Sequence, residues 1–156
     1  LDQLLTTDTI EIQAEASDWR EVVDLAGNIL LKQKAIRPSY IRAIKEILVD
    51  HGPYMVIMPG VVLLHAFPED GVNQLSMSMV TLKTPVNFQH ECYDPVYCAF
   101  VLAAPDNRSH LRALSELADM LHGGGTLDIF RSTYHKARVL HEISHYSKEQ
   151  KTEMQK

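Results

Sequence analysis

The fold is decided by the stretch Tyr97–Ala104, which has the sequence YCAFVLAA. It is apolar along almost its whole length, without the alternating polar positions of a strand that faces water on one side. Such a run is typical of a central strand covered on both faces. The turn-forming residues Pro105-Asp106-Asn107 follow it and break the strand. The stretch therefore predicts a sheet buried between two other layers.

Working outward, other segments supply more strands for this sheet. Residues 54–58 and Val61–Leu64 are apolar and are separated by Pro59-Gly60. Residues 75–82 alternate, with Leu75, Met77 and Met79 on one face, and residues 9–14 alternate as a half-buried strand does. We expect a core that contains these side chains: Val61, Leu63, Val101 and Leu102.

Helical spacing of apolar residues places helices on either side of these strands. Asp18 and Glu21 have the spacing of a capping box, and Pro38 suits the first turn of a second helix. A third helix begins near Ser109 and stops at the glycines 123–125. A last helix runs from about 133 to 147, and the polar tail 148–156 is expected to fray. The predicted fold is therefore an α/β class, layered α/β/α domain over residues 1–147, with a central, mostly buried mixed sheet.

Composition excludes several classes of protein. The 156 residues suit one domain, with 46% hydrophobic and 22% charged residues. A net charge of −5 without a basic block disfavours nucleic-acid binding. No segment approaches the about 20 apolar residues that span a bilayer, and the start lacks signal-peptide features. We expect a cytoplasmic protein in which Cys92 and Cys98 are buried or half-buried free thiols.

His65 is the first candidate functional residue. It ends the apolar run 61–64, and the turn residues Pro68-Glu69-Asp70-Gly71 follow shortly after it. A rigid strand that meets a loop often carries functional groups, and a neutral imidazole there can act as base, metal ligand or nucleophile. The alternative is a half-buried histidine with a structural hydrogen bond.

His110 is the second candidate. It lies in the first turn of the third helix, directly after the central strand, and helix N-termini favour anions such as phosphate. If the ends of the strands at Leu64 and Ala104 adjoin, His65 and His110 face one crevice. Two imidazoles there suit phosphoryl transfer, one as nucleophile and one as a hydrogen-bond donor. The alternative is that His110 only decorates the helix.

Several motifs resemble the type-2 enzyme IIA (EIIA) domains of the bacterial phosphoenolpyruvate-dependent sugar phosphotransferase system (PTS), over roughly residues 5–145. The segment that carries His65 resembles their active-site strand, and the segment that carries His110 resembles their second histidine motif. Within this mannitol/fructose superfamily, the ascorbate- and pentitol-related branch is nearest. The matching segments are Met58–Ala66, Leu82–Phe88, Asp94–Val96 and Ala103–Leu111, with Gly52–Tyr54 and Phe67–Val72 indicating the branch.

The resemblance implies a phosphotransferase that acts through a phosphohistidine. His65 would accept a phosphoryl group from the phosphorylated carrier HPr and pass it to a cysteine or histidine of an EIIB component, while His110 assists. The resemblance implies no metal and no small cofactor. It leaves the sugar and the oligomeric state open, a homo-oligomer included.

The chain departs from the family at two positions. Leu64 stands where the family usually has proline before the active histidine, so the aim of His65 is expected to differ. The region Ile44–Leu48 lacks the arginine that supports the site in the mannitol branch. Arg108 is a candidate replacement, although arginines at helix starts are more often solvated.

Two other functions compete with the relay. The sequence His141-Glu142-Ile143-Ser144-His145 matches the zinc-peptidase pattern HExxH, which would need a third ligand such as Glu149 or Glu153 from the tail. EIIA-like domains also serve as regulatory phosphorylation modules beside transcription regulators, but this chain shows no neighbouring nucleic-acid-binding domain.

Overall fold

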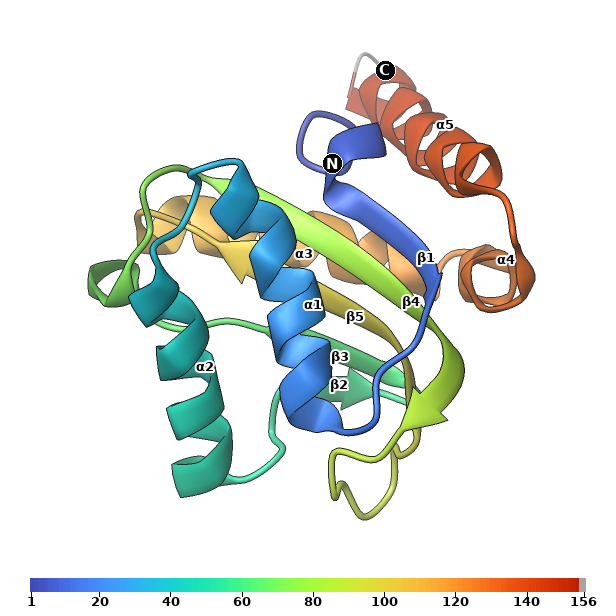
Figure 1. The fold of residues 1–156 in the computed structure, drawn as a ribbon. Helices are drawn as coiled ribbons and strands as arrows, with labels where there is room; N and C mark the ends of the chain where they lie inside the picture. Colours follow the sequence, from blue (N-terminus) through green and yellow to red (C-terminus); the bar gives the residue numbers. More distant parts are fainter. Residues whose placement is uncertain (155–156) are drawn as a thin grey trace.

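A computed structural model describes residues 1–154, and the side chains of residues 1–150, as one mixed sheet between two layers of helices (Figure 1). Within this part, five strands pair in the order β1-β4-β5-β3-β2. β1 is parallel to β4 and β5 is parallel to β3, whereas the other neighbours are antiparallel. The predicted layered α/β/α architecture is confirmed. The strands are β1 (Ile10–Ala14), β2 (Val56–Met58), β3 (Val61–Leu64), β4 (Ser76–Val86) and β5 (Val96–Ala103).

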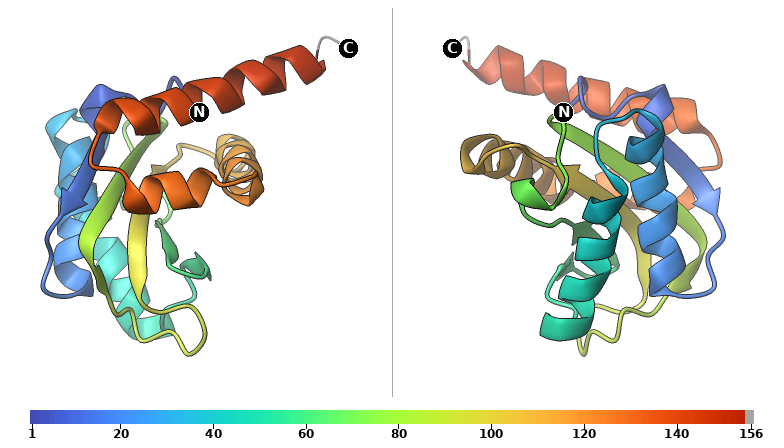
Figure 2. Two further views of the ribbon diagram at one scale, coloured as in Figure 1. Left: turned by 90° about the vertical axis from the view of Figure 1, so that its right-hand side faces the viewer. Right: turned by 60° about the vertical axis from the view of Figure 1, so that its left-hand side comes forward.

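Helices cover both faces of the sheet, as the turned views of Figure 2 show. The first face carries α1 (Trp19–Lys32) and α2 (Pro38–His51). The opposite face carries α3 (Asn107–His122), α4 (Thr126–Ser132) and α5 (Lys136–Met154). Two short 3-10 turns, η1 (Thr7–Thr9) and η2 (Pro68–Asp70), complete the described chain. None of the described helices is long and apolar enough to cross a bilayer.

β5 separates two hydrophobic cores. Alternate side chains of a strand point to opposite faces, and every residue of β5 is buried. Ala99 and Val101 join the core beneath α1 and α2, whereas Phe100 and Leu102 join the core beneath α3, α4 and α5. The four residues predicted for the core are at most 1% exposed, so their prediction is confirmed: Val61, Leu63, Val101 and Leu102.

The predicted helix signals act as expected. Asp18 caps α1 by accepting a hydrogen bond from Glu21 N at 2.9 Å, and Pro38 is the first residue of α2. Gly52 ends α2 with φ at 80°, a conformation that glycine adopts without steric cost. These local signals fix where α1 and α2 begin and where α2 ends.

The chain after residue 125 differs from the prediction. No element was expected over 126–132, where α4 forms, and the last helix starts at Lys136 and continues to Met154. Residues 148–154 are therefore helical and not a separate frayed tail, because no glycine or proline interrupts them; residues 155–156 lie outside the described part. The Gln150 amide also donates to Asp119 Oδ2 of α3 at 2.8 Å.

Two burial expectations also need correction. Cys98 is buried, and this burial raises the pKa of its thiol, but Cys92 is exposed because it lies in the loop between β4 and β5. Both thiols are free, as predicted. β4 alternates in sequence, yet both of its faces are buried from Ser76 to Leu82. Its Ser78 hydroxyl is satisfied by donating to Ala26 O of α1 at 2.7 Å.

Candidate phosphoryl-transfer site

The ends of two parallel strands bring the candidate residues together. β3 pairs with β5 in register, with Leu64 opposite Val101. His65 follows the end of β3, and β5 leads into α3 at the same edge of the sheet. The condition for a shared crevice, that these strand ends adjoin, is therefore met.

The His65 ring is held by a hydrogen bond to its own strand. Its Nδ1 atom lies 2.8 Å from the carbonyl oxygen of Leu63. A carbonyl oxygen only accepts, so Nδ1 carries the hydrogen and Nε2 of the neutral ring keeps its lone pair. The ring is half-buried and meets Tyr54 edge-on, with 6.1 Å between ring centroids. A strand-fixed imidazole with an available Nε2 lone pair is a suitable nucleophile.

His110 lies beside His65, with 5.5 Å between the ring centroids and 51° between the ring planes. It is held by the first turn of α3, where its backbone N–H donates to Asp106 O at 3.1 Å. Asp106 caps that turn by accepting from Ser109 N at 2.8 Å. Burial, together with the nearby His65, lowers the pKa of His110. The neutral ring is therefore favoured and can donate one N–H into the crevice.

The two histidines line one crevice of about 210 Å³. Its walls combine apolar side chains with a few polar groups, and none of the lining residues is lysine or arginine. Besides the histidines, the side chain of Asn107 can donate hydrogen bonds there. The lining residues are Ile47, Tyr54, His65, Ala66, Phe67, Pro68, Ala104, Asp106, Asn107 and His110.

Tyr40 supports the crevice from behind, a role that the sequence did not indicate. Its side chain is 1% exposed. Its hydroxyl donates to Leu102 O at 2.6 Å and accepts from Ala66 N at 3.0 Å. Burial raises the pKa of Tyr40 to about 12, so the hydroxyl keeps its hydrogen. The Tyr40 hydroxyl therefore connects α2 to β5 and to Ala66, the residue after His65.

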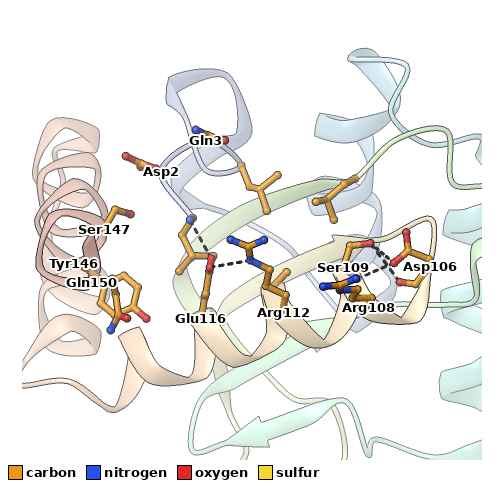
Figure 3. A pocket seen from close by; sticks show the side chains of 14 residues that line it. Asp2, Gln3, Asp106, Arg108, Ser109, Arg112, Glu116, Tyr146, Ser147 and Gln150 are labelled. Carbon is orange, nitrogen blue, oxygen red and sulfur yellow. Dashed lines mark hydrogen bonds and ion pairs between the residues drawn. The ribbon is translucent and has the colours of Figure 1, made fainter. Parts of the chain in front are cut away.

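The structure shows the surroundings of the positions at which the chain departs from the EIIA pattern that it resembles. Leu64 is fully buried, and Ile47 of α2 lines the crevice without supplying a charge. Arg108 is exposed and lines a different groove, shown in Figure 3, whose lining does not include His65. Arg108 therefore does not replace the missing arginine inside the crevice.

The HExxH segment lies on α5. The rings of His141 and His145 stack with 6.4 Å between centroids, and His145 Nε2 is 3.1 Å from Glu149 Oε1. Both histidines are exposed. Among the described side chains, no group of three or more potential donors is arranged to hold a metal ion. The segment thus has the character of a surface helix with an i, i+4 pair.

Most of the chain is similar to one known protein family. Residues 3–146 match the family described as "Phosphoenolpyruvate-dependent sugar phosphotransferase system, EIIA 2". The chain belongs to this family. It is therefore a phosphoryl-relay component of a sugar PTS. This family assignment is favoured over the zinc-peptidase function suggested by the HExxH segment.

Individual EIIA proteins show how far the similarity extends. The ascorbate-specific PTS system EIIA component of Salmonella typhi is 34% identical over 140 residues, covering 89% of this chain and 91% of the relative. The cryptic mannitol-specific phosphotransferase enzyme IIA CmtB of Escherichia coli has a TM-score of 0.83 and 29% identity, with 92% and 97% of the two chains covered. Enzyme IIAMTL of Escherichia coli, solved with phosphorylated enzyme IIBMTL, shares the fold at a TM-score of 0.79 and 19% identity, with 90% and 99% covered.

Proposed function

We propose that His65 is the phosphoryl-accepting residue of this EIIA protein and that Nε2 is the reacting atom. The observation that carries the proposal is the hydrogen bond from Nδ1 to Leu63 O, beside His110 and within the crevice. The Nε2 lone pair forms the new bond to phosphorus while the bond between phosphorus and the donor nitrogen of HPr breaks. The electron pair of the broken bond returns to the HPr ring. His65 Nδ1 keeps its hydrogen and continues to donate it to the carbonyl oxygen of Leu63.

His110 and Asn107 supply hydrogen bonds to the phosphoryl oxygens in this proposal. Both line the crevice with His65, and that lining holds no lysine or arginine. Phosphoryl transfer is catalysed mainly by positioning and by stabilising the charge on the oxygens. Neutral donors next to the start of α3 give this stabilisation without a cationic side chain. We assign His110 the principal supporting role and Asn107 a secondary one.

The surface around the crevice suits protein partners. Tyr54 and Phe67, which line the crevice, are large apolar side chains that are more than half exposed, at 54% and 62%. Exposed apolar groups around a reactive residue favour docking of another protein. We propose phosphorylated HPr as the donor and a cysteine or histidine of EIIB as the acceptor, in the cytoplasm. The names of the curated relatives favour ascorbate as the transported sugar.

Phosphorylation of His65 is tested by incubation with phosphoenolpyruvate, enzyme I and HPr, followed by mass measurement of the intact protein. The wild type should gain one phosphoryl group, and the His65→Ala protein should gain none. His122→Ala, an exposed histidine at the end of α3, is the matched control and should behave as wild type. Full phosphorylation of His65→Ala would disprove the assignment.

Addition of the EIIB component to the phosphorylated protein tests the second half of the relay. Transfer of the group to EIIB supports transport. A stable phosphoprotein that passes its group to no EIIB would instead favour the regulatory alternative.

A further inference from the structure

A second hollow lies along α3, and its lining does not include His65. This α3–α5 groove has a volume of about 540 Å³, within the range of small-molecule sites. It is bounded by α3, α5 and the N-terminal segment (Figure 3). Among its lining residues are Asp106, Arg108, Arg112, Glu116, Ser147 and Gln150. The phosphoryl relay uses none of these residues except Asp106, which also borders the crevice.

Ser147 is the first indication that the groove takes a ligand. Its side chain is 8% exposed, and its Oγ atom has no hydrogen-bond partner. Buried hydroxyls are nearly always hydrogen-bonded, because an unpaired one costs free energy. Figure 3 shows the Ser147 hydroxyl directed from α5 toward the N-terminal segment. A hydroxyl or other polar group of a bound molecule would satisfy it.

The charged residues of the groove indicate the chemistry of that molecule. Arg108 and Arg112 lie one turn apart on α3, so their guanidinium groups can bind one anionic group. The Asp106 carboxylate is already engaged by Ser109, whose N and Oγ donate to it at 2.8 and 2.7 Å. The Glu116 carboxylate is paired through both oxygens: Oε1 lies 3.7 Å from Arg112 Nε, and Oε2 accepts a hydrogen bond from the N-terminal amine of Leu1 at 3.3 Å. It can also accept hydrogen bonds from ligand hydroxyls.

We propose that the α3–α5 groove binds a sugar-derived anion, a polyhydroxylated small molecule with one phosphate or carboxylate. The arginines bind the anionic group, while Glu116, Gln150 and Ser147 bind hydroxyls. Such molecules are the chemical class that a sugar PTS produces, so the groove is suited to feedback. Because Asp106 starts α3 and borders both hollows, an occupied groove would alter the position of His110 and slow phosphoryl transfer. The effect on rate rests on the relay function proposed above, whereas binding does not.

Binding is measured on the full chain by two-dimensional NMR and calorimetry with glucose phosphate as the probe. The expected result is shifted signals from α3 and the segment 1–4 together with Ser147. Gluconate tests whether a carboxylate suffices, and sorbitol and inorganic phosphate test the hydroxyls and the anion separately. Weaker binding of the last two supports the combined recognition. The proposal would be overturned if inorganic phosphate bound as tightly as glucose phosphate. It would also be overturned if neither glucose phosphate nor gluconate bound.

Three variants locate the site. Arg108→Gln and Arg112→Gln should each weaken binding of the probe by roughly tenfold or more, because each removes a charge-assisted hydrogen bond. Ser147→Ala should weaken it by a smaller factor and leave the fold intact. Arg138→Gln, an exposed arginine of α5 outside the groove, is the matched control and should bind as wild type. Loss in Arg138→Gln equal to that in Arg108→Gln would show nonspecific attraction and overturn the site.

Coupling to the relay is measured as the rate of His65 phosphorylation by phosphorylated HPr, with and without saturating glucose phosphate. The probe should slow the wild type, and roughly tenfold more probe or greater should be needed to slow the Arg112→Gln protein to the same extent. Unchanged wild-type rates despite measured binding would overturn the regulatory role. If His65 is never phosphorylated, the relay proposal fails while the binding result stands independently.

Discussion

At the scale of single residues, Tyr40 has the largest role that the sequence did not reveal. Its hydroxyl joins Leu102 O to Ala66 N, and Ala66 directly follows His65. We predict that Tyr40→Phe lowers the free energy of unfolding by about 1–3 kcal/mol, because the buried Leu102 O and the partly buried Ala66 N each lose a hydrogen bond. Phosphoryl transfer should slow but persist, since the nucleophile remains.

Chemical denaturation and transfer kinetics check this prediction. Tyr134→Phe is the matched control because Tyr134 is 71% exposed, and it should leave both quantities unchanged. If Tyr40→Phe were as stable as the wild type, the two hydrogen bonds of the Tyr40 hydroxyl would contribute nothing to the free energy of unfolding.

The sequence predicted the two histidines but not their support. His65 and His110 were identifiable because each follows a strongly apolar strand, and the structure brings them within 5.5 Å between ring centroids. The hydroxyl of Tyr40 could not be placed from the sequence, because its partners Ala66 and Leu102 are distant from it along the chain. The bond from His65 Nδ1 to Leu63 O is local, yet it depends on a side-chain rotamer that no sequence pattern specifies.

At the scale of elements, the caps of α1 and α3 allow a controlled comparison. Asp106 accepts from Ser109 N at 2.8 Å, and Asp18 accepts from Glu21 N at 2.9 Å. We predict that Asp18→Ala lowers the free energy of unfolding by about 0.5–2 kcal/mol and that Asp106→Ala also lowers it, because each removes a helix cap. Only Asp106→Ala should also slow phosphoryl transfer, because α3 carries His110. Transfer kinetics beside thermal melts check this, and equal slowing in Asp18→Ala would contradict it.

The turn between β2 and β3 requires glycine at position 60. Gly60 has φ at 78°, and a Cβ there would clash with the ring of Tyr97. We predict that Gly60→Ala lowers the free energy of unfolding by more than about 1 kcal/mol, since it combines backbone strain with a ring clash. Gly124→Ala is the matched control, because a Cβ there meets nothing within 4 Å. Denaturation curves that coincide for both variants would contradict the prediction.

The elements that the sequence missed share a physical cause. α4 has only seven residues, from Thr126 to Ser132, so it offers too few turns for a clear apolar period. The end of α5 was placed too early because the residues after Ser147 are polar. Polarity alone does not end a helix, and Lys, Glu and Gln are all good helix formers. The strands and the first two helices were predictable because capping, turn and apolar signals agree there.

At the scale of the whole molecule, α3 separates two hollows that the sequence could not distinguish. His110 and Asn107 face the crevice, whereas Arg108 and Arg112 line the α3–α5 groove. The sequence suggested Arg108 as a replacement for the arginine absent from Ile44–Leu48, because Arg108 lies within the second histidine motif. Residues adjacent in a helix point in different directions, and only the packed structure shows which face borders His65.

The stability of the whole molecule should depend on pH through His110. Its pKa is lowered in the folded protein, by burial and by His65, from the ordinary value of 6.5. As the pH falls below that value, the unfolded chain binds the proton first, so acidification favours unfolding. We predict that the free energy of unfolding falls between about pH 7.5 and about pH 5, and that it falls less in His110→Gln, which has no imidazole at this site. Urea unfolding of both proteins at the two pH values measures the difference. Since His110 is partly exposed, the difference should be small, and an equal or steeper acid loss in His110→Gln would show that the neutral His110 ring is not favoured by folding.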